Sequence, residues 1–561
     1  MAAYESVSQW FRTCSSSVIK DRLDPECISW TKSRIDSCLT THPHRTSHEK
    51  FCPKRLIDVR SEPIRLALRQ DVDQDGLAAS PCYAALSYCW GTQAESNCQL
   101  KTTNKSLPEM LSAIDFHQLP SAIQDAVLTT RSLSIPFLWV DALCIIQDNR
   151  RDWEQQSAEM DRVYRNAYLT IASPASNFCN EGFRYASDDK VYIDFHSTVN
   201  PTIKGLFSIR LLGGTTRSRD SLSDVDIIFS SIEDSAWSSR GWTYQELFMS
   251  NRLLFFGRSE LLFMCSTSHY MSLPAELAGF YWIHHDGDWT QHNAQEAYDD
   301  WQHLVICYSA RCGGFTRNSD ILPAFSGIAA HFQKTVCLQQ DDYVAGLWRD
   351  DLWRSAAWNM CGINTRWHTT LSARLQALGS TADYIAPSWS WVNCGSVEFV
   401  AHDSSTKPAR SECTIDVWTT AKGENRLGEI LTAGLRITGK VFPLPSDLER
   451  QKLDHTYRDF CPWVPQTIRE GEHRWRIYLD WSPESDSQAR EELKMVVTGS
   501  YNKGEGMPRE YFGLLVHEAG GIHRGKYFRV GVFQSEPNVW RPQSSEKGFL
   551  QHVETQTLEI I

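Results

Sequence analysis

The chain has 561 residues, enough for roughly two to four domains of about 100–200 residues each. Hydrophobic residues make up 42% of it and charged residues 22%, which excludes wholesale disorder. The net charge of -12 argues against non-specific binding to nucleic acid, because such binding needs a concentrated basic surface. We therefore expect a folded protein without a nucleic-acid partner.

The cysteines and the apolar segments indicate the compartment of the protein. The 17 cysteines are scattered without a CxxC pair, so the sequence indicates neither a disulfide framework nor a ribbon-type zinc site. The N-terminal stretch has no apolar segment of signal-peptide length and is interrupted by Arg12. The longest apolar run, Ile135–Ile146, contains Asp141 and is shorter than the ~20 residues of a membrane span. We expect a cytoplasmic protein with no membrane span.

The first 50 residues carry apolar side chains at helical spacing, which predicts an N-terminal helical segment at 1–50. Two cysteines and three histidines gather near its end, in a cluster that could be drawn as a metal site: Cys38, His42, His44, His48 and Cys52. Their spacing matches no standard zinc pattern, and polar loops often collect histidines. We therefore expect no metal in this protein.

Strands and helices alternate over the next part of the chain. The predicted strands are Lys54–Val59, Pro63–Gln70, Tyr83–Ser87, Phe137–Asp141 and Tyr168–Ala172. A helix over Leu119–Leu133 has Ser121 and Gln124 at the spacing of a capping box, and a second helix is capped by Asp148 or Asn149. This alternation predicts an α/β fold with a wound, mostly parallel sheet flanked by helices.

Residues 174–236 are polar and rich in Ser and Asp, which predicts a surface insertion with one strand at Leu206–Leu212. A short helix with Trp242, Gln245 and Glu246 follows. The last two strands expected in this half of the chain are Arg252–Gly257 and Leu261–Ser266, which form a hairpin.

The chain changes character beyond about residue 270. Three helical stretches are expected there, at Trp301–Arg311, Asp320–Phe332 and Tyr343–Trp353. A strand-rich tail begins at Ala386–Gly395 and ends with Tyr527–Phe533. The sequence thus predicts a helical segment at 1–50, an α/β domain at 51–270 and a helical, then β-rich, region at 271–561.

Three blocks of sequence carry a family resemblance. They are YAALSYCWGT at Tyr83–Thr92, SIPFLWVDALCIIQDNRRDW at Ser134–Trp153 and SSRGWTYQELFMSNRLLFFG at Ser238–Gly257. In this order and spacing they resemble the fungal heterokaryon incompatibility (HET) domain family. The resemblance implies a protein of heterokaryon incompatibility, which is non-self recognition with programmed cell death. It also implies a distant relation to TIR domains, which have a flavodoxin-like fold and in some cases cleave NAD with a single glutamate.

The resemblance implies a candidate site. Glu246 is the candidate catalytic carboxylate, with Asp141 second and with Glu154 and Glu159 as rivals. Asp141 is supported independently, because polar residues just beyond the carboxyl ends of parallel strands face the ligand crevice. The expected substrate-binding residues are Tyr88, Trp90, Arg240, Trp242 and Gln245. No cofactor is expected, and NAD enters only as a candidate substrate.

Each candidate also has a purely structural interpretation. Glu246 could hold its helix to the sheet through a salt bridge to Arg240 or Arg252, and Asp141 could cap the turn after its strand. The aromatic residues could belong to the core. Ser87 and Cys144 are weaker candidates for a nucleophile, because neither lies beside a histidine or in a nucleophile elbow.

This sequence also departs from the HET pattern at two positions. Family members commonly carry an acidic residue before the cysteine at position 265, where this chain has Met264, and a second cysteine where it has Arg45. Two other functions stay open: a small-molecule enzyme of fungal secondary metabolism built on the HET scaffold, and a non-catalytic interaction module. The partners expected are the chain itself, another incompatibility protein, or a small-molecule ligand.

Overall fold

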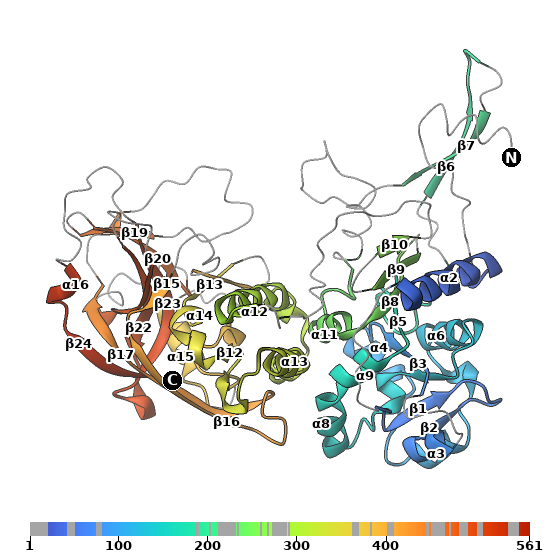
Figure 1. Ribbon diagram of the computed structural model, residues 1–561, viewed down its shortest axis with the longest axis horizontal. Coiled ribbons are helices and arrows are strands. Elements are labelled where there is room, and N and C mark those ends of the chain that lie inside the picture. The colour runs from blue at the N-terminus through green and yellow to red at the C-terminus, as the bar shows by residue number, and fades with distance from the viewer. Residues whose placement is uncertain are drawn as a thin grey trace. The chain divides into compact units, whose positions relative to one another are not determined.

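The computed structural model divides into two compact units, each described here by itself (Figure 1). The first contains Met1–Ser239 and Thr243–Asp286, and the second contains Arg240–Trp242 and Gly287–Ile561. The structure describes residues 21–41, 51–74, 81–185, 190–200, 204–210, 232, 235–258, 261–265, 269–271, 289, 292–361, 370–381, 384–400, 409–444, 448–449, 466–470, 473–481, 492–501, 509–536 and 549–561.

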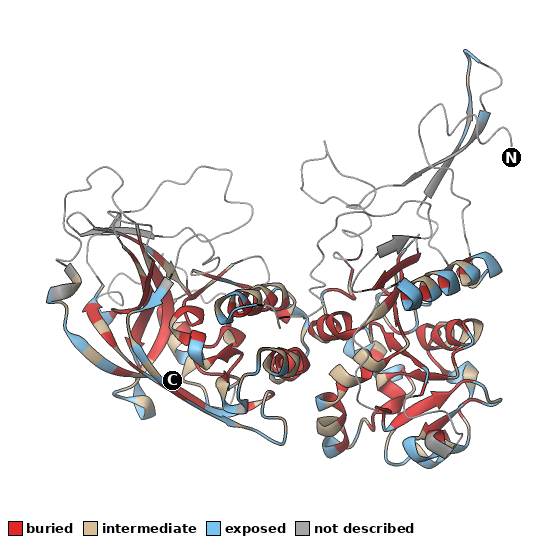
Figure 2. Cartoon of the chain, viewed as in Figure 1, coloured by how far each residue is buried: buried red, intermediate tan, exposed pale blue. Residues whose placement is uncertain are grey.

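An eight-stranded sheet forms the centre of the first unit, in the order β10-β9-β8-β5-β3-β4-β1-β2. Its strands are β1 (Arg55–Asp58), β2 (Arg65–Leu68), β3 (Tyr83–Ser87), β4 (Phe137–Trp139), β5 (Leu169–Ala172), β8 (Arg252–Phe256), β9 (Leu261–Cys265) and β10 (His269–Met271). Every residue of β3, β4 and β5 is buried, as their continuous apolar sequences predict (Figure 2).

The sheet is mixed, and the α/β class is confirmed. Strands β4, β3, β5 and β8 run parallel, whereas β1, β2, β9 and β10 pair antiparallel at the two edges. The expectation of a mostly parallel sheet is therefore correct for its centre and wrong for its edges. The connections explain the difference, because short hairpins join β1 to β2 and β8 to β9, while parallel strands need a long crossover.

The central strand β3 marks a reversal in the path of the chain. From β3 the chain crosses to β4 on one side, and from β4 it crosses back to β5 on the other side of β3. Loops that leave neighbouring strands in opposite directions open a crevice beyond the carboxyl ends of those strands. Ser87, at the end of β3, stands in register with Ala172 at the end of β5, so the carboxyl ends of these two strands lie side by side.

Helices fill the crossovers. The first crossover contains α4 (Gln93–Cys98), α5 (Leu107–Ser112) and α6 (Ser121–Ser132), and the second contains α7 (Asp141–Cys144), α8 (Arg150–Ala158) and α9 (Met160–Asn166). Asn149 caps α8 by accepting a hydrogen bond from the Asp152 amide at 3.1 Å, as predicted. The capping box at Ser121 is wrong, because Pro120 holds the cap position and Gln124 instead donates to the Leu119 carbonyl at 2.7 Å.

Helix α2 (Pro25–Thr41) packs on this unit through a buried stripe that includes Ile35 and Cys38. Residues 1–20 and 42–50 of the predicted N-terminal segment lie outside the described residues. The strand expected at Leu206–Leu212 overlaps β7 (Lys204–Arg210), which pairs only with β6 (Lys190–His196) among the described strands. Residues 211–231 of the expected insertion also lie outside the described ranges.

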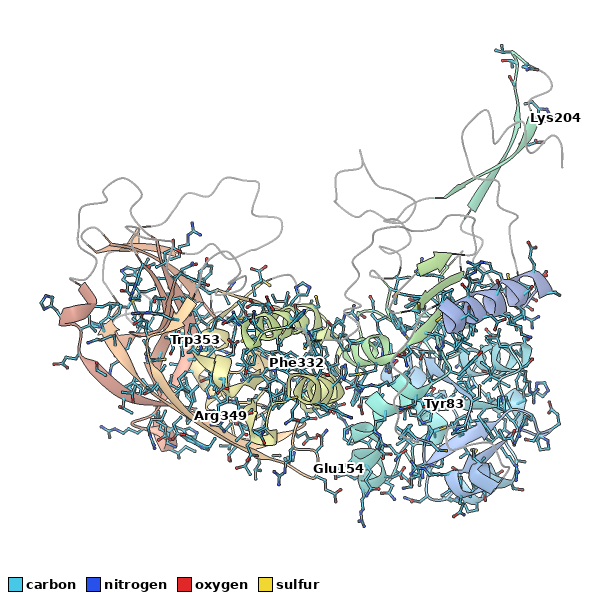
Figure 3. All side chains as sticks on the ribbon, viewed as in Figure 1. Tyr83, Glu154, Lys204, Phe332, Arg349 and Trp353 are labelled. Carbon is cyan, nitrogen blue, oxygen red and sulfur yellow. The ribbon has the colours of Figure 1, made fainter. Side chains whose placement is uncertain are left out.

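The second unit begins with α12 (Ala294–Ser309) and α13 (Ser326–Val336), which overlap two predicted helices. Trp301 packs between Phe325 and Phe332, both with ring centroids 5.0 Å away (Phe332 is labelled in Figure 3). The helix expected over Tyr343–Trp353 is wrong for its first half, whereas a 3-10 turn at Arg349–Asp351 and α14 (Leu352–Ser355) make its second half helical. A tight hairpin of β11 (Tyr343–Val344) and β12 (Leu347–Trp348) occupies its first half.

The turn of this hairpin explains the error. Ala345 and Gly346 have positive φ angles of 52° and 92°, which a helix does not allow. A side chain at Gly346 would meet Nε1 of Trp391 at 2.7 Å, so both the backbone and the packing require glycine there.

Most of the second unit is the predicted β-rich tail. Ten strands form one sheet: β15 (Ala409–Ser411), β16 (Thr414–Ala421), β17 (Ile430–Pro443), β18 (Leu448–Glu449), β19 (Gln466–Glu470), β20 (His473–Leu479), β21 (Lys494–Tyr501), β22 (Glu510–Glu518), β23 (Tyr527–Glu536) and β24 (Thr555–Ile560). A two-stranded antiparallel sheet, β13 (Trp358–Met360) with β14 (Val397–Phe399), and helix α15 (Leu371–Leu378) pack beside it. No described helix is long and apolar enough to cross a membrane.

Candidate functional site

A buried hydrogen-bonded group lies at the carboxyl end of β3, in the first unit. The Ser87 hydroxyl donates to Oε2 of Glu246 and accepts from Nε1 of Trp237 at 2.7 Å. Ser87 is 1% exposed, Glu246 5% and Trp237 0%. Glu246 comes from α11 (Gly241–Met249), so this group joins the first and third sequence blocks across the chain. We call these three residues the inner group.

The inner group holds the Glu246 carboxylate in one position. A buried carboxylate is costly unless donors compensate it, and a hydroxyl that donates to a carboxylate makes a strong hydrogen bond. Arg252, one of the expected salt-bridge partners, donates Nε to the Tyr168 carbonyl at 2.7 Å and stacks on the Tyr168 ring. In the structure, one of the contacts that hold Glu246 in place is therefore a hydrogen bond from a neutral donor, Ser87.

A second group lies where β4 ends, and it meets solvent. Nε1 of Trp90 donates to Oδ2 of Asp141 at 2.9 Å, and the ammonium of Lys101 lies 4.9 Å from the centre of the Trp90 ring. All three side chains are partly exposed. Oδ1 of Asp141, the first residue of α7, also accepts from the Ala142 amide at 2.7 Å. We call Trp90, Lys101 and Asp141 the outer group.

The electrostatics of the outer group are set by its partial burial. Burial lowers the pKa of Lys101, while the charges of Cys179 and Asp141 oppose that shift. The Lys101 ammonium donates to Oγ of Ser96 at 3.1 Å. A cation above an indole whose N–H points to a carboxylate gives a surface that suits a flat, polar ligand.

Three buried polar atoms in segments that follow β3 and β5 have no hydrogen-bond partner among the described residues. They are Nε2 of Gln99, Oγ of Ser173 and Oγ of Ser176. Ser173 directly follows β5, and its amide donates to the Ser87 carbonyl at 3.1 Å, so it neighbours the inner group. Gln99 accepts from the Tyr88 hydroxyl at 3.0 Å through its other atom. Unpartnered buried groups cost about 1–3 kcal/mol each, so these three atoms have hydrogen-bonding capacity for a further polar group, water included.

The remaining expected residues are placed as follows. Gln245 is fully buried in α11, and Tyr88 is buried beside Gln99. Arg240 and Trp242 are partly exposed and are counted with the second unit, so the site described here is built from first-unit residues alone. The roles of all seven expected site residues stay predictions.

The rival carboxylates have simple structural roles. Glu154, labelled in Figure 3, pairs with Arg150 one turn away at 2.7 Å, and Glu159 pairs with Arg162 at 3.5 Å. Both glutamates are partly exposed and serve as ordinary helix-surface ion pairs. These contacts leave Glu246 and Asp141 as the better candidates.

Cys144 does not fit the role of a nucleophile. It is fully buried, and burial raises the pKa of its thiol to about 12, so the reactive thiolate is scarce at neutral pH. The Ser87 hydroxyl is engaged by Glu246 and Trp237, and no histidine takes part in those bonds.

The departure at Met264 has a packing explanation. Met264 is fully buried in β9, in an apolar cluster that also contains Trp237, Leu253 and Phe255. An acidic side chain in that cluster would lose its hydration without a described partner. Met264 therefore supports the inner group by packing around Trp237.

The cysteine and histidine cluster is only partly described, because His42, His44 and His48 lie outside the described residues. Cys38 lies against Cys265, and a hydrogen bond between the two, together with burial, raises the pKa of Cys38. Among the described residues, no group of three or more Cys, His, Asp or Glu is arranged to hold a metal ion.

Sequence reasoning missed Trp237, Lys101, Gln99, Ser173 and Ser176. Ser173 had a usable signal, because it directly follows a predicted strand, as Asp141 does. The others come from loops and a short helix whose positions depend on the folded chain.

The comparisons with known proteins address the family. Residues 83–246 match the family model of the heterokaryon incompatibility protein (HET). The match runs from the first residue of β3 to Glu246, so it includes every residue of the inner and outer groups. Comparisons with curated proteins and with solved structures gave no match. Residues 83–246 are therefore assigned to a heterokaryon incompatibility (HET) domain.

Proposed function

We propose that this HET domain is an effector of heterokaryon incompatibility and that it cleaves NAD at the crevice beyond β3 and β5. The observation that carries the proposal is the inner group: a carboxylate fixed by Ser87 at the point where the path of the sheet reverses. The programmed cell death expected of the family would then follow from loss of NAD.

The strand order supports a ligand at this place. Numbered by their order in the chain, the four parallel strands β4-β3-β5-β8 follow the order 2-1-3-4. Doubly wound folds of the flavodoxin type share this order and bind their ligand between the first and third strands. Those strands are β3 and β5 here, and the unpartnered Ser173 hydroxyl lies beside them.

The chemistry assigns separate roles to the two groups. When the bond between nicotinamide and ribose breaks, nicotinamide leaves with the bonding electrons, positive charge develops on the ribose, and water adds to it. A fixed carboxylate stabilises that charge, as in glycoside hydrolysis, and more strongly where water is excluded. Glu246 would serve this role. Trp90 would stack on a flat ring, with Asp141 holding the indole in place.

The test uses the full chain, purified and incubated with NAD, with release of nicotinamide as the readout. Glu246→Gln should lower the rate by about 100-fold or more, because one charge aimed at the transition state is lost. Glu154→Gln is the matched control, since it removes the same charge from an ion pair on the surface of α8. It should leave the rate unchanged.

Expression in a fungal host tests the biological part. The intact chain should arrest growth, and Glu246→Gln should restore it while the protein level stays the same. Healthy growth with abundant intact protein would contradict an effector role. An intact, folded chain that releases no nicotinamide would contradict NAD cleavage.

A non-catalytic interaction module is the second candidate, and one observation favours it. Glu246 is only 5% exposed, and its bond to Ser87 joins α11 to β3, as a purely structural contact would. In that case Glu246→Gln would lower the stability of the domain and leave a partner-binding function intact at permissive temperature. The secondary-metabolism enzyme stays a prediction without a supporting contact here.

A further inference from the structure

Two arginines share one carboxylate inside the second unit. Nη1 of Arg529, on β23, lies 2.5 Å from Oδ2 of Asp480, and Nη2 of Arg374, on α15, lies 3.4 Å from the same oxygen. Each of the three residues is at most 1% exposed. Among the described residues, Asp480 is the one carboxylate in an ion pair with either arginine.

The group therefore carries one excess positive charge in the protein interior. The thiol of Cys394 is a further neighbour of the group, and its Sγ lies 3.2 Å from Nη2 of Arg374. Burial raises the pKa of this thiol to about 11, so it remains neutral near pH 7 and supplies no counter-charge. Burial is also the largest cause that lowers the pKa of Arg529. An uncompensated buried charge is strongly unfavourable.

The hydrogen bonds show what kind of partner would fit. Nη2 of Arg529 donates to the Trp358 carbonyl, and the guanidinium lies over the Trp358 ring, 3.3 Å from its centre. Nε of Arg374 and Nε of Arg529 have no partner among the described residues. The indole N–H groups of Trp481 and Trp389 also have no partner among the described residues. Trp481 follows Asp480 in the chain, and the carbonyl of Trp389 accepts a hydrogen bond from Trp358 at 2.9 Å. All four are donors, and each can donate a hydrogen bond to an acceptor such as an anion.

A third buried arginine in the same unit provides a contrast. Arg354 is 0% exposed and pairs with both Asp299 and Asp351, the latter at 2.8 Å. Gln302 donates to the other oxygen of Asp351 at 3.0 Å. The fold thus surrounds Arg354 with two carboxylates, whereas it gives Arg374 and Arg529 one between them.

We propose that the second unit binds a small monovalent inorganic anion, such as chloride, beside Arg374 and Arg529. One negative charge balances the single excess charge, and hydrogen bonds from arginine to an anion are among the strong ones. A doubly charged phosphate would overcompensate it. The near-complete burial of Arg374, Arg529 and Asp480 suits a small ion that the unit encloses as it folds, rather than an organic ligand that enters from solvent.

The first test is thermal unfolding of the full chain in chloride and in methanesulfonate at equal ionic strength and pH. A ligand that binds only the folded state raises its stability, so Tm should rise with chloride by about 5 °C and then level off. Diffraction from crystals grown in bromide should show an anomalous peak beside both arginines. Equal Tm in the two salts, with no bromide peak at this position, would overturn the proposal and indicate buried water instead.

Two variants give the test a matched control. Arg374→Gln removes the excess charge and should abolish the chloride dependence of Tm. Arg354→Gln removes a buried arginine that has its own carboxylates, so it should lower Tm and leave the chloride dependence unchanged. If Arg374→Gln keeps the full chloride dependence, the site is not at this arginine and the proposal fails. If that variant does not fold, the bromide diffraction of the native chain decides alone.

Discussion

The inner and outer groups of the HET domain differ in how each holds its carboxylate. Glu246 is buried and receives a hydroxyl proton from Ser87, whereas Asp141 is partly exposed and receives an indole N–H from Trp90. Both carboxylates lie where a crossover meets the sheet, yet one is fixed by the core and the other by a surface aromatic residue. Under the proposed function, Glu246 would act through its charge, whereas Asp141 would act by holding Trp90 in place.

The largest difference in stability between the inner and outer groups is expected when the tryptophan of each group, Trp237 or Trp90, is removed. Trp237→Ala should lower the free energy of unfolding by about 3–5 kcal/mol, because it leaves a cavity beside Phe255 and Met264. Trp90→Ala removes a partly exposed ring and one hydrogen bond, so we expect about 1–2 kcal/mol. Denaturation in urea measures both changes. Equal losses would contradict the division into a buried and an exposed group.

Removal of a single hydroxyl tests the inner group more finely. Ser87→Ala takes away the donor to Glu246 and the acceptor for Trp237, and should cost about 2–3 kcal/mol. Ser173→Ala is the matched control at the end of the neighbouring strand. Its hydroxyl has no partner among the described residues, so the change should cost less than about 0.5 kcal/mol or stabilise the fold. Equal effects would show that the Ser87 bonds contribute little to stability.

The central strands could be predicted from sequence because they are continuous apolar runs that end in turns. Tyr83–Ser87 is the clearest case, since the predicted strand and β3 have the same bounds. The edges of the sheet and the hairpin at Ala345–Gly346 could not be predicted in this way. Their strand directions depend on short connections that reverse the chain, and the sequence pattern does not show which connections do so. The helical interpretation of Tyr343–Trp353 failed in its first half because periodicity alone does not reveal a positive φ angle.

The sequence predicted those site residues that lie directly after a predicted strand or within a family motif. Asp141 could be selected from its place after a strand, and Glu246 from the family resemblance. The bond from Ser87 to Glu246 joins residues 159 positions apart, and that from Trp237 to Ser87 joins residues 150 apart. No local pattern encodes such contacts, because they exist only once β3 and α11 pack together.

A change in the outer group should be milder. Asp141→Asn keeps an oxygen for Trp90 or Ala142 and removes the negative charge at the start of α7, so the cost should be about 1 kcal/mol. Glu246→Gln should cost more, because its carboxylate is buried. Urea denaturation of the two variants under the same buffer measures the difference. A larger loss for Asp141→Asn would contradict the assignment of Asp141 to a solvent-facing group.

The smallest expected effect concerns pH. The pKa of Lys101 is lowered in the folded state, mainly by burial, so the unfolded chain holds the Lys101 proton more tightly than the folded chain does. Stability therefore rises with pH as the folded-state pKa is passed, and the gain is complete above the unfolded value of about 10.4. Lys101→Met should remove this part of the pH dependence, measured as the difference in unfolding free energy between the two proteins from neutral to alkaline pH. A difference that does not change with pH would show that Lys101 is as hydrated in the folded chain as in the unfolded chain, and would contradict partial burial of its ammonium in the outer group.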